Sequence, residues 1–206
     1  ATCVGIAAGP GGLYFSAPYK DINPVPPGNP TLRGANIPRG RHAGEPHGLC
    51  AYGVEALNVL RIEKGHVTHA ELDGRVTADD VGLGRMMAGS KPDFIGKRLS
   101  SRFGLTAADR AQLVGLRALE ADKDMRAGAH LLKEGAKPST LNDQGWVSSA
   151  CFSPTLGGHI ALAFLKSGRE RYGERIVVWD QLRGVEAMAE VCDPVFVDPQ
   201  NHRLTG

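Results

Sequence analysis

Lone polar residues inside apolar runs are the side chains of this sequence best suited to bind a ligand or to take part in a reaction. Arg126 is the main example. It is followed by Ala127-Gly128-Ala129, small residues that would let a ligand or a backbone come close. A buried guanidinium needs a carboxylate, a phosphate or several carbonyl oxygens as partners. The sequence therefore predicts either an internal ion pair, for example with Asp124 or Asp143, or an anchor for an acidic ligand or a neighbouring domain.

Two histidines, His66 and His69, are three residues apart, a spacing that could place both on one metal ion. No third ligand converges on them in the sequence, so we expect exposed or capping histidines and predict no metal site. The sequence gives no better support for nucleophilic catalysis than for a metal site. The pair Ser148-Ser149 lacks the Gly-x-Ser-x-Gly surroundings of a nucleophile elbow, and we predict no catalytic residue.

The composition is that of an ordinary globular protein. Hydrophobic residues make up 42% of the 206 residues and charged residues 22%. A formal net charge of +2 gives no support for a nucleic acid or an anionic membrane as partner. No apolar run approaches the ~20 residues that span a bilayer, and we see no secretory signal.

Four cysteines are scattered through the chain without a Cys-x-x-Cys pair. This pattern favours reduced thiols and a cytoplasmic location over a disulfide scaffold. Cys151 and Cys192 lie inside apolar runs, so we expect them to be small buried side chains rather than nucleophiles.

Short runs rich in Val, Ile, Phe and Trp, separated by Gly and Pro, predict β-strands in the second half of the chain. The expected strands are residues 112–119, 125–132, 145–152, 159–165, 175–182 and 185–192, and residues 194–197 would close the sheet. Strands at this spacing favour a barrel over a βαβ sheet. The predicted fold class is α+β, with short helices followed by a C-terminal antiparallel β-barrel of about six strands.

Residues 45–119 are predicted to be mostly helix and turn. Over residues 55–64 the apolar positions mix i, i+3 and i+4 steps, which predicts a buried helix that Gly65 ends. The mixed spacing leaves open that residues 61–64 are extended instead.

Two further helices are predicted after it. Thr77 and Asp80 have the spacing of a capping box, which would open a short helix. Residues 93–102 predict an amphipathic helix with Phe94, Ile95 and Leu99 facing inward.

The first 44 residues differ from the rest because glycine and proline are dense. We expect one or two short strands at most, followed by an irregular segment over residues 21–44. The predicted domains are this Gly/Pro-rich head (1–44), a middle region (45–110) and the barrel (111–206).

Several motifs resemble a known family. The string from Pro46 to Gly65, Pro-His-Gly-Leu-Cys-Ala-Tyr-Gly-Val-Glu-Ala-Leu-Asn-Val-Leu-Arg-Ile-Glu-Lys-Gly, resembles the late part of folate-binding aminomethyltransferase domains, as in glycine-cleavage T-proteins. Lys-Pro-Asp-Phe-Ile-Gly-Lys, from residue 91, is similar to the family's segment before its barrel. Met-Arg-Ala-Gly-Ala-His-Leu, from residue 125, and Asn-Asp-Gln-Gly-Trp-Val-Ser-Ser-Ala-Cys-Phe-Ser-Pro-Thr-Leu-Gly, from residue 142, resemble the barrel itself. The closing Glu-Val-Cys-Asp-Pro-Val-Phe-Val-Asp-Pro is most similar to the C-terminal region of heterotetrameric sarcosine oxidase α subunits.

The resemblance implies a folate-side part of an enzyme that oxidises sarcosine at a flavin in another subunit. In that family the folate half takes the methylene unit from the imine and forms 5,10-methylenetetrahydrofolate, whereas without folate the imine hydrolyses to formaldehyde. Tetrahydrofolate is thus the implied cofactor, and the implied partners are folate and the other sarcosine oxidase subunits. Flavin and NAD are expected only in absent regions or in partner subunits.

The family motifs also assign the candidate site residues. Arg126 matches the arginine of the barrel motif, and Arg61 matches that of a Leu-Arg-Leu-Glu segment; both would belong to the folate-domain framework. Tyr52 and Glu55 lie near the motif and are candidates to line the site. Leu57 stands where T-proteins have an arginine for the glutamate tail of folate, so that contact must be absent or differently built.

The family's catalytic aspartate lies upstream of the motif at Pro46, where this chain has only the unmatched head. We therefore expect the isolated chain to be inactive, although it would be part of an enzyme. Two alternatives remain open: a non-catalytic barrel module that packs against other subunits, and a truncated remnant whose head is not native to the fold.

Overall fold

The computed structural model describes residues 6–9, 12–16, 46, 50–87, 92–120 and 122–205. Contacts within the chain divide it into two compact units, residues 1–60 with 200–206, and residues 61–199. The predicted irregular segment over residues 21–44 lies outside the described residues, and the predicted division at residues 44 and 110 stays a prediction. None of the described helices is both long and apolar enough to cross a membrane.

The first unit contains a three-stranded sheet in the order β1-β2-β3. Strand β1 (Ile6–Gly9) pairs antiparallel with β2 (Gly12–Ser16), which confirms the short strands predicted in the head. Strand β3 (Cys50–Tyr52) pairs parallel with β2 and was not predicted, because three residues carry too little periodicity. A short helix, α4 (His202–Thr205), lies near the C-terminus.

Helix α2 (Val54–Glu63) confirms the predicted helix and shows that the extended alternative for residues 61–64 is wrong. It ends at Glu63, and Gly65 stops its continuation with a φ of 69°, the left-handed conformation that favours glycine. The prediction that the helix is buried is wrong for most of its length. Val54, Leu57 and Leu60 are exposed, and only Ile62 and Glu63 in the last turn are buried. The apolar pattern identified a helix but could not tell which of its turns pack.

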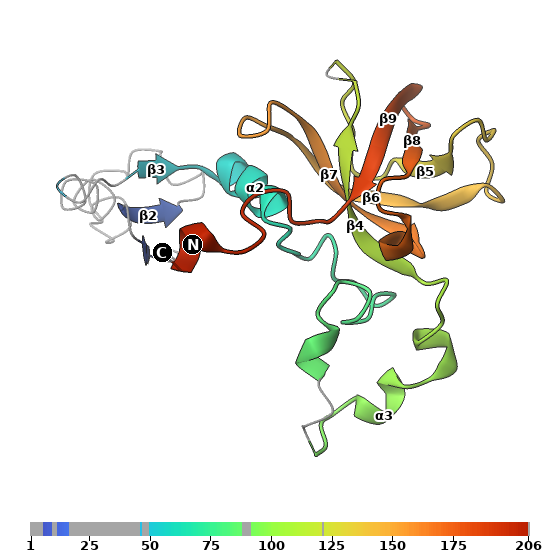
Figure 1. The fold of residues 1–206 in the computed structure, drawn as a ribbon, viewed down its shortest axis with the longest axis horizontal. Coiled ribbons are helices and arrows are strands. Elements are labelled where there is room, and N and C mark those ends of the chain that lie inside the picture. The colour runs from blue at the N-terminus through green and yellow to red at the C-terminus, as the bar shows by residue number, and fades with distance from the viewer. Residues whose placement is uncertain are drawn as a thin grey trace, which may run out of the picture. The chain divides into compact units, whose positions relative to one another are not determined.

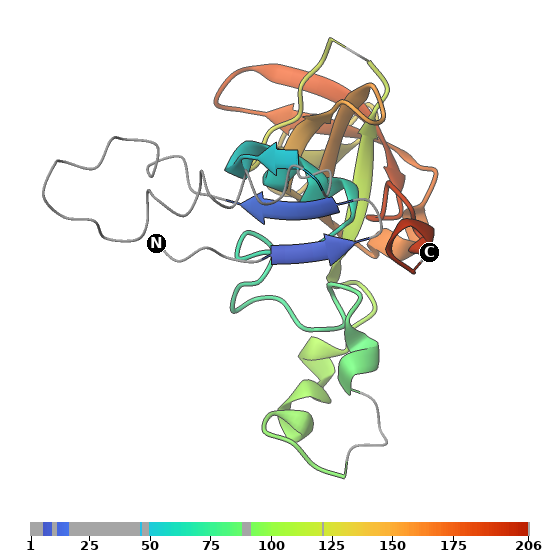
Figure 2. The same cartoon turned by 90° about the vertical axis from the view of Figure 1, so that its left-hand side faces the viewer.

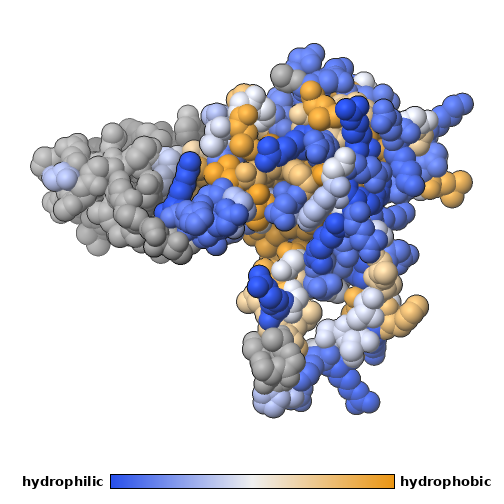
Figure 3. All heavy atoms as spheres, in the orientation of Figure 1, coloured by the Kyte–Doolittle hydropathy of each residue, from blue (hydrophilic) through white to orange (hydrophobic). Residues whose placement is uncertain are grey.

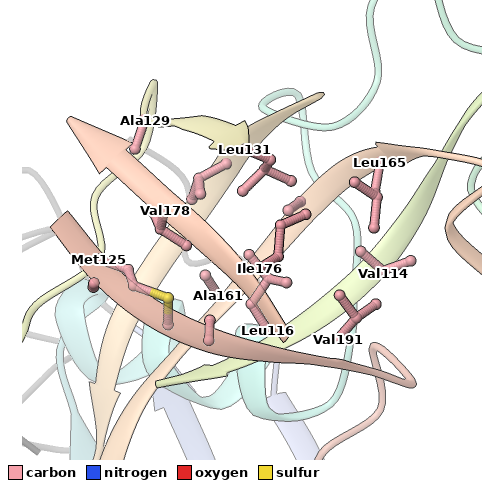
Figure 4. Close-up of a cluster of buried hydrophobic side chains, with 14 residues drawn as sticks. Val114, Leu116, Met125, Ala129, Leu131, Ala161, Leu165, Ile176, Val178 and Val191 are labelled. Atoms are coloured by element: carbon pink, nitrogen blue, oxygen red, sulfur yellow. The ribbon is translucent and has the colours of Figure 1, made fainter. Parts of the chain in front are cut away.

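Six antiparallel strands close a barrel in the order β4-β7-β6-β5-β8-β9, which confirms the predicted fold class (Figure 1). They are β4 (Ala111–Ala118), β5 (His130–Lys133), β6 (Asp143–Ser153), β7 (Gly158–Lys166), β8 (Arg175–Asp180) and β9 (Val185–Cys192). Figure 4 shows apolar side chains such as Val114, Leu131 and Ile176 gathered in its core. Several alanines share this core, as expected where strands on opposite walls lie close together.

Two of the predicted strands differ from the structure. The strand expected over residues 125–132 begins only at His130, because Gly128 turns the chain with a φ of 87° and donates its N–H to the Val147 carbonyl. Residues 194–197 are not a strand, since β4 already pairs with β9 and Pro194 lacks an N–H for the ladder.

The segment that follows β9 packs on the barrel instead. The N–H groups of Phe196 and Val197 both donate to the Glu63 carbonyl at 2.9 Å. Phe196 is buried beside Gly115, where a Cβ would lie 2.8 Å from the ring. This segment therefore covers the last turn of α2 and one wall of the barrel.

Residues 82–87 and 92–109 belong to an arm that Figures 1 and 2 both show extending away from the barrel. The arm contains η3 (Gly84–Met87), α3 (Lys97–Ser100) and η4 (Phe103–Leu105). The amphipathic helix predicted over residues 93–102 is wrong, because Gly96 adopts a left-handed φ of 95° and leaves α3 only four residues long. The inward orientation predicted for Ile95 and Leu99 is wrong too, since both are exposed.

The predicted capping box is confirmed at the start of this region. Thr77 N donates to Asp80 Oδ2 at 2.8 Å, and Asp80 N donates to Thr77 Oγ1 at 3.2 Å. The residues that follow are turns rather than the predicted helix, because glycines at 82 and 84 favour turns over helix.

Candidate functional site

A buried carboxylate, Glu71, lies at the centre of the most extensive polar cluster built around a predicted site residue. Ser149 Oγ and Ser148 Oγ of strand β6 donate to Glu71 Oε1 at 2.6 Å and 2.8 Å. Arg61 Nη1 and Thr68 N donate to Glu71 Oε2 at 2.9 Å and 2.8 Å. Both carboxylate oxygens are therefore fully engaged, which compensates for the loss of water around a side chain that is 0% exposed.

The protonation state of Glu71 follows from these contacts. Burial acts to raise the pKa of this carboxyl group, but hydrogen bonds from Ser149, Thr68 and Ser148, together with the charge of Arg61, lower it further than burial raises it. Glu71 is thus ionised at neutral pH. A carboxylate with a lowered pKa and no vacant oxygen is a poor general base, so the geometry indicates a positioning role.

A second buried carboxylate, Glu63, lies in the same region of the second unit. Ser153 Oγ of β6 donates to Glu63 Oε1 at 2.6 Å. Nearby, burial and then the charge of Glu63 raise the pKa of the Cys151 thiol to about 11, although Arg61 acts in the opposite direction. Burial likewise raises the pKa of Cys192. Neither thiol is therefore primed as a nucleophile. The prediction that both side chains are buried is wrong, because both are only half-buried.

The structure places Arg61 in the last turn of α2 with its side chain only 13% exposed. Besides the ion pair to Glu71, its Nη2 donates to Ser149 Oγ at 2.6 Å. The guanidinium therefore links α2 to the barrel wall through internal partners.

Arg126 lies in the turn before β5 and is exposed rather than buried, so the expectation of a buried guanidinium is wrong. The ion pair proposed with Asp124 is present, at 2.7 Å, and both partners are exposed. Asp143, the other proposed partner, pairs instead with His130 at 3.2 Å. Arg61 and Arg126 thus pair with different carboxylates, Glu71 and Asp124.

Tyr52 and Glu55 belong to the first unit, whereas Arg61 and Arg126 belong to the second. Tyr52 is the last residue of β3 and is half-buried, and Glu55 is exposed in the first turn of α2. Their predicted role as lining residues stays a prediction.

No sequence motif marks Glu71, although its carboxylate accepts hydrogen bonds from Arg61, Thr68, Ser148 and Ser149. It lies ten residues after Arg61 and 78 before Ser149, so no local motif connects the three. His66 and His69 are both exposed, and no group of three His, Cys, Asp or Glu side chains within the described ranges could hold a metal ion.

An open hollow of about 760 Å³ lies at the root of the arm, lined by Asp79, Gly82, Gly84, Arg85 and Arg169. Neither Arg61 nor Arg126 lines it, and its lining has no aromatic ring on which a pterin could stack. Arg61 is held by internal partners and does not line this hollow, so the hollow does not bring the predicted residues together.

Comparison with known proteins identifies the barrel. Residues 112–198 match the model of the glycine cleavage T-protein C-terminal barrel domain. The chain is 51% identical over 162 residues to the sarcosine oxidase subunit alpha of Rhizobium meliloti (strain 1021), covering 79% of this chain and 16% of that protein. It is 35% identical over 167 residues to the sarcosine oxidase subunit alpha of Corynebacterium sp. (strain P-1), covering 80% of this chain and 17% of that protein.

The chain therefore spans less than a fifth of the length of these curated relatives. Among solved structures, it resembles the glycine cleavage system aminomethyltransferase T from Bartonella henselae with a TM-score of 0.65 and 24% identity. That match covers 80% of this chain and 44% of the other, and it shows a shared fold. The resemblance indicated by the sequence motifs is confirmed, and residues 112–198 are similar to glycine cleavage T-protein C-terminal barrel domains.

Proposed function

We propose that this chain is the folate-side part of a sarcosine oxidase α subunit, in which it acts as the framework of the folate site. The reaction it serves is the transfer of a methylene unit from oxidised sarcosine to tetrahydrofolate. The identity of 51% over 162 residues to one such subunit supports the assignment. We expect the isolated chain to be inactive, because Glu71, the buried carboxylate beside Arg61 among the described residues, is held by hydrogen bonds and is a poor general base.

One observation supports the framework role above all: the saturation of Glu71 by Arg61, Ser148, Ser149 and Thr68. Because both oxygens of the Glu71 carboxylate are engaged, it has no free acceptor for a ligand, but the cluster holds the end of α2 on the barrel wall. Transfer of a one-carbon unit depends on the positions of both partners, so such a scaffold contributes by restricting them.

Arg126 is the residue of this chain best suited to contact folate. Its guanidinium is 54% exposed and pairs with a carboxylate that is 40% exposed, so an acidic ligand could replace Asp124 at small cost. Tyr52 and Glu55 remain candidates to line the pocket. The partners we expect are folate and the other subunits, with flavin and NAD bound elsewhere in the cytoplasmic assembly.

A chimera tests this function directly. The matching region of the Rhizobium meliloti α subunit would be replaced by this chain, and the whole enzyme assembled with its other subunits. The chimera should oxidise sarcosine and, with tetrahydrofolate present, release methylenetetrahydrofolate in place of most of the formaldehyde. An assembled chimera that oxidises sarcosine at the normal rate but releases only formaldehyde would refute the proposal.

The same chimera carrying Arg126→Ala shows whether Arg126 contacts folate or only supports the structure around the folate site. Loss of folate transfer at unchanged sarcosine oxidation and unchanged thermal stability would assign Arg126 to the folate site. The matched control is Arg183→Ala, because Arg183 is 51% exposed and pairs with Asp180 at 2.7 Å on a different hairpin.

A further inference from the structure

The hollow at the root of the arm has a positively charged lining. Its volume is about 760 Å³, and its walls are Asp79, Gly82, Gly84, Arg85 and Arg169. Two arginines and one aspartate give this lining a formal charge of +1. The next carboxylate along the chain, Asp80, does not change this balance, because Arg110 pairs with it at 2.5 Å. The lining is therefore suited to an anion.

Arg169 is held in one orientation by only part of its guanidinium. Its main-chain N–H donates to Gln112 Oε1 at 3.1 Å, and its Nη2 donates to the carbonyls of Asp79 and Asp80. A guanidinium has five N–H donors, so Nε and Nη1 keep three that bond to none of the described residues. The carboxylate oxygen Asp79 Oδ2 lies 3.9 Å from Nη1, which is too far for a hydrogen bond. The carbonyls therefore orient a guanidinium that still has donors for a ligand.

Arg85 contributes a second guanidinium to the lining. Its side chain is exposed in η3, and it forms no hydrogen bond or ion pair with another residue in the described ranges. Gly82 keeps the space beside Arg169 open, because the residue has no side chain and its φ of 78° favours glycine. Figure 3 shows hydrophilic residues on the surface where the arm meets the barrel. A ligand would thus reach both arginines from solvent.

We propose that Arg85 and Arg169 bind the carboxylate group of a small molecule in this hollow. A carboxylate carries one negative charge, which matches the charge of the lining, and its two oxygens fit the forked donors of a guanidinium. The volume leaves room for the rest of the molecule. Both arginines and the carbonyls that orient Arg169 belong to this chain, so the site needs no group from another part of an α subunit. The inference is independent of the proposed function, since neither Arg61 nor Arg126 lines the hollow.

Nuclear magnetic resonance of the isotope-labelled full chain tests the proposal, with sodium acetate as the probe and sodium chloride at equal ionic strength as the reference. Acetate should shift the Nε–H resonance of Arg169 saturably, with a Kd on the order of millimolar, because it makes only a few charged hydrogen bonds. Arg85→Ala should weaken acetate binding about threefold or more. Arg98→Ala is the matched control, because Arg98 is another exposed arginine of the arm and does not line the hollow. The control should leave the Kd for acetate unchanged.

Asp79→Asn tests the charge balance with a change of opposite sign. Removing this carboxylate raises the formal charge of the lining from +1 to +2, so acetate should bind about threefold more tightly. Asp79 and Arg85 are both exposed, so neither variant should lower the melting temperature by more than a few degrees. Weaker binding by Asp79→Asn would contradict the proposal, because the aspartate would then support the site instead of competing with the ligand.

Several other outcomes would overturn the proposal. Acetate could shift the Arg169 resonance no more than chloride does, or Arg98→Ala could weaken binding as much as Arg85→Ala. Inorganic phosphate that binds at least about tenfold more tightly than acetate at equal ionic strength would assign the hollow to a phosphate group instead.

The assembled chimera shows whether the site stays open in a whole α subunit. The chimera should broaden the resonance of isotope-labelled acetate more than the same chimera with Arg85→Ala does. Equal broadening would mean that another carboxylate of the subunit fills the hollow, and it would overturn the proposal of a small-molecule site. Folate transfer is a separate measurement on the same chimera, so the failure of either proposal leaves the other standing.

Discussion

Arg61 and Glu71 form a buried ion pair in which the guanidinium Nη1 lies 2.9 Å from the carboxylate Oε2. Ser149 of β6 connects the same two residues a second time, since it accepts a hydrogen bond from Arg61 and donates one to Glu71. The last turn of α2 is thereby fastened to the barrel by charge as well as by the apolar contact of Ile62.

Glu71→Gln should lower the free energy of unfolding by about 3–5 kcal/mol, because it leaves the Arg61 guanidinium buried without a counter-charge. Urea denaturation followed by tryptophan fluorescence measures the change. Asp73→Asn is the control, since it breaks the exposed pair with Arg75 and should change stability little. Equal effects of the two substitutions would show that the buried pair contributes no more to the free energy of unfolding than the exposed pair does.

Stability should fall on acidification, and Glu71 and Asp80 should account for part of the loss. Both pKa values are lowered in the folded state: burial acts to raise them, but hydrogen bonds from Ser149 to Glu71 and from Arg110 to Asp80 outweigh it. A carboxyl group whose pKa is lower in the folded state stabilises the fold at a pH above its unfolded-state pKa of about 4. This stabilisation is lost as the pH falls through the folded-state pKa. Melting temperatures between about pH 7 and pH 3 should therefore decline less steeply for Glu71→Gln. A parallel decline would contradict the lowered pKa of Glu71.

Gly145→Ala should prevent the barrel from closing or destabilise it by about 3 kcal/mol or more. A Cβ at Gly145 would lie 1.9 Å from the Phe164 carbonyl oxygen of β7. Gly158→Ala is the matched control, because Gly158 is a strand glycine with open space around the position of its Cβ. Thermal unfolding of both variants, monitored by circular dichroism, measures the difference, and a stable Gly145→Ala barrel would contradict the close packing of β6 on β7.

Cys151 should react slowly with thiol reagents in the folded chain, because burial raises the pKa of its thiol to about 11 and the thiolate is the reactive form. Labelling at about pH 7.5, with peptides identified by mass spectrometry, measures the rate. Unfolding in urea should accelerate the reaction many-fold. Rapid labelling in the folded state would contradict the raised pKa of the half-buried thiol.

The barrel could be predicted from the sequence because each strand is a local run whose alternation and flanking glycines are visible in a few residues. The wrong predictions concern segments whose structure depends on contacts with residues far away in the sequence. Residues 194–197 look like a strand, but the β4–β9 pairing has already closed the barrel, and Phe196 packs beside Gly115 instead. Ile95 looks like a core residue because its neighbours are amphipathic, yet nothing described packs over the arm.

The candidate site was less predictable than the fold. Arg61 could be selected from a family motif, but its partners Glu71 and Ser149 lie 10 and 88 residues away and have no motif of their own. Arg126 was selected for its small neighbours, and its exposure depends on the turn at Gly128. Contacts between distant segments depend on the three-dimensional fold, which local patterns do not report.

The framework account is tested most directly by calorimetric titration of the purified chain with tetrahydrofolate. We expect no saturable binding in the micromolar range and no turnover, because Arg61 is held by Glu71 and Ser149 and the hollow at the root of the arm is lined by neither Arg61 nor Arg126. Saturable micromolar binding that Arg126→Ala abolishes would contradict it, because the chain would then contain a self-sufficient folate site.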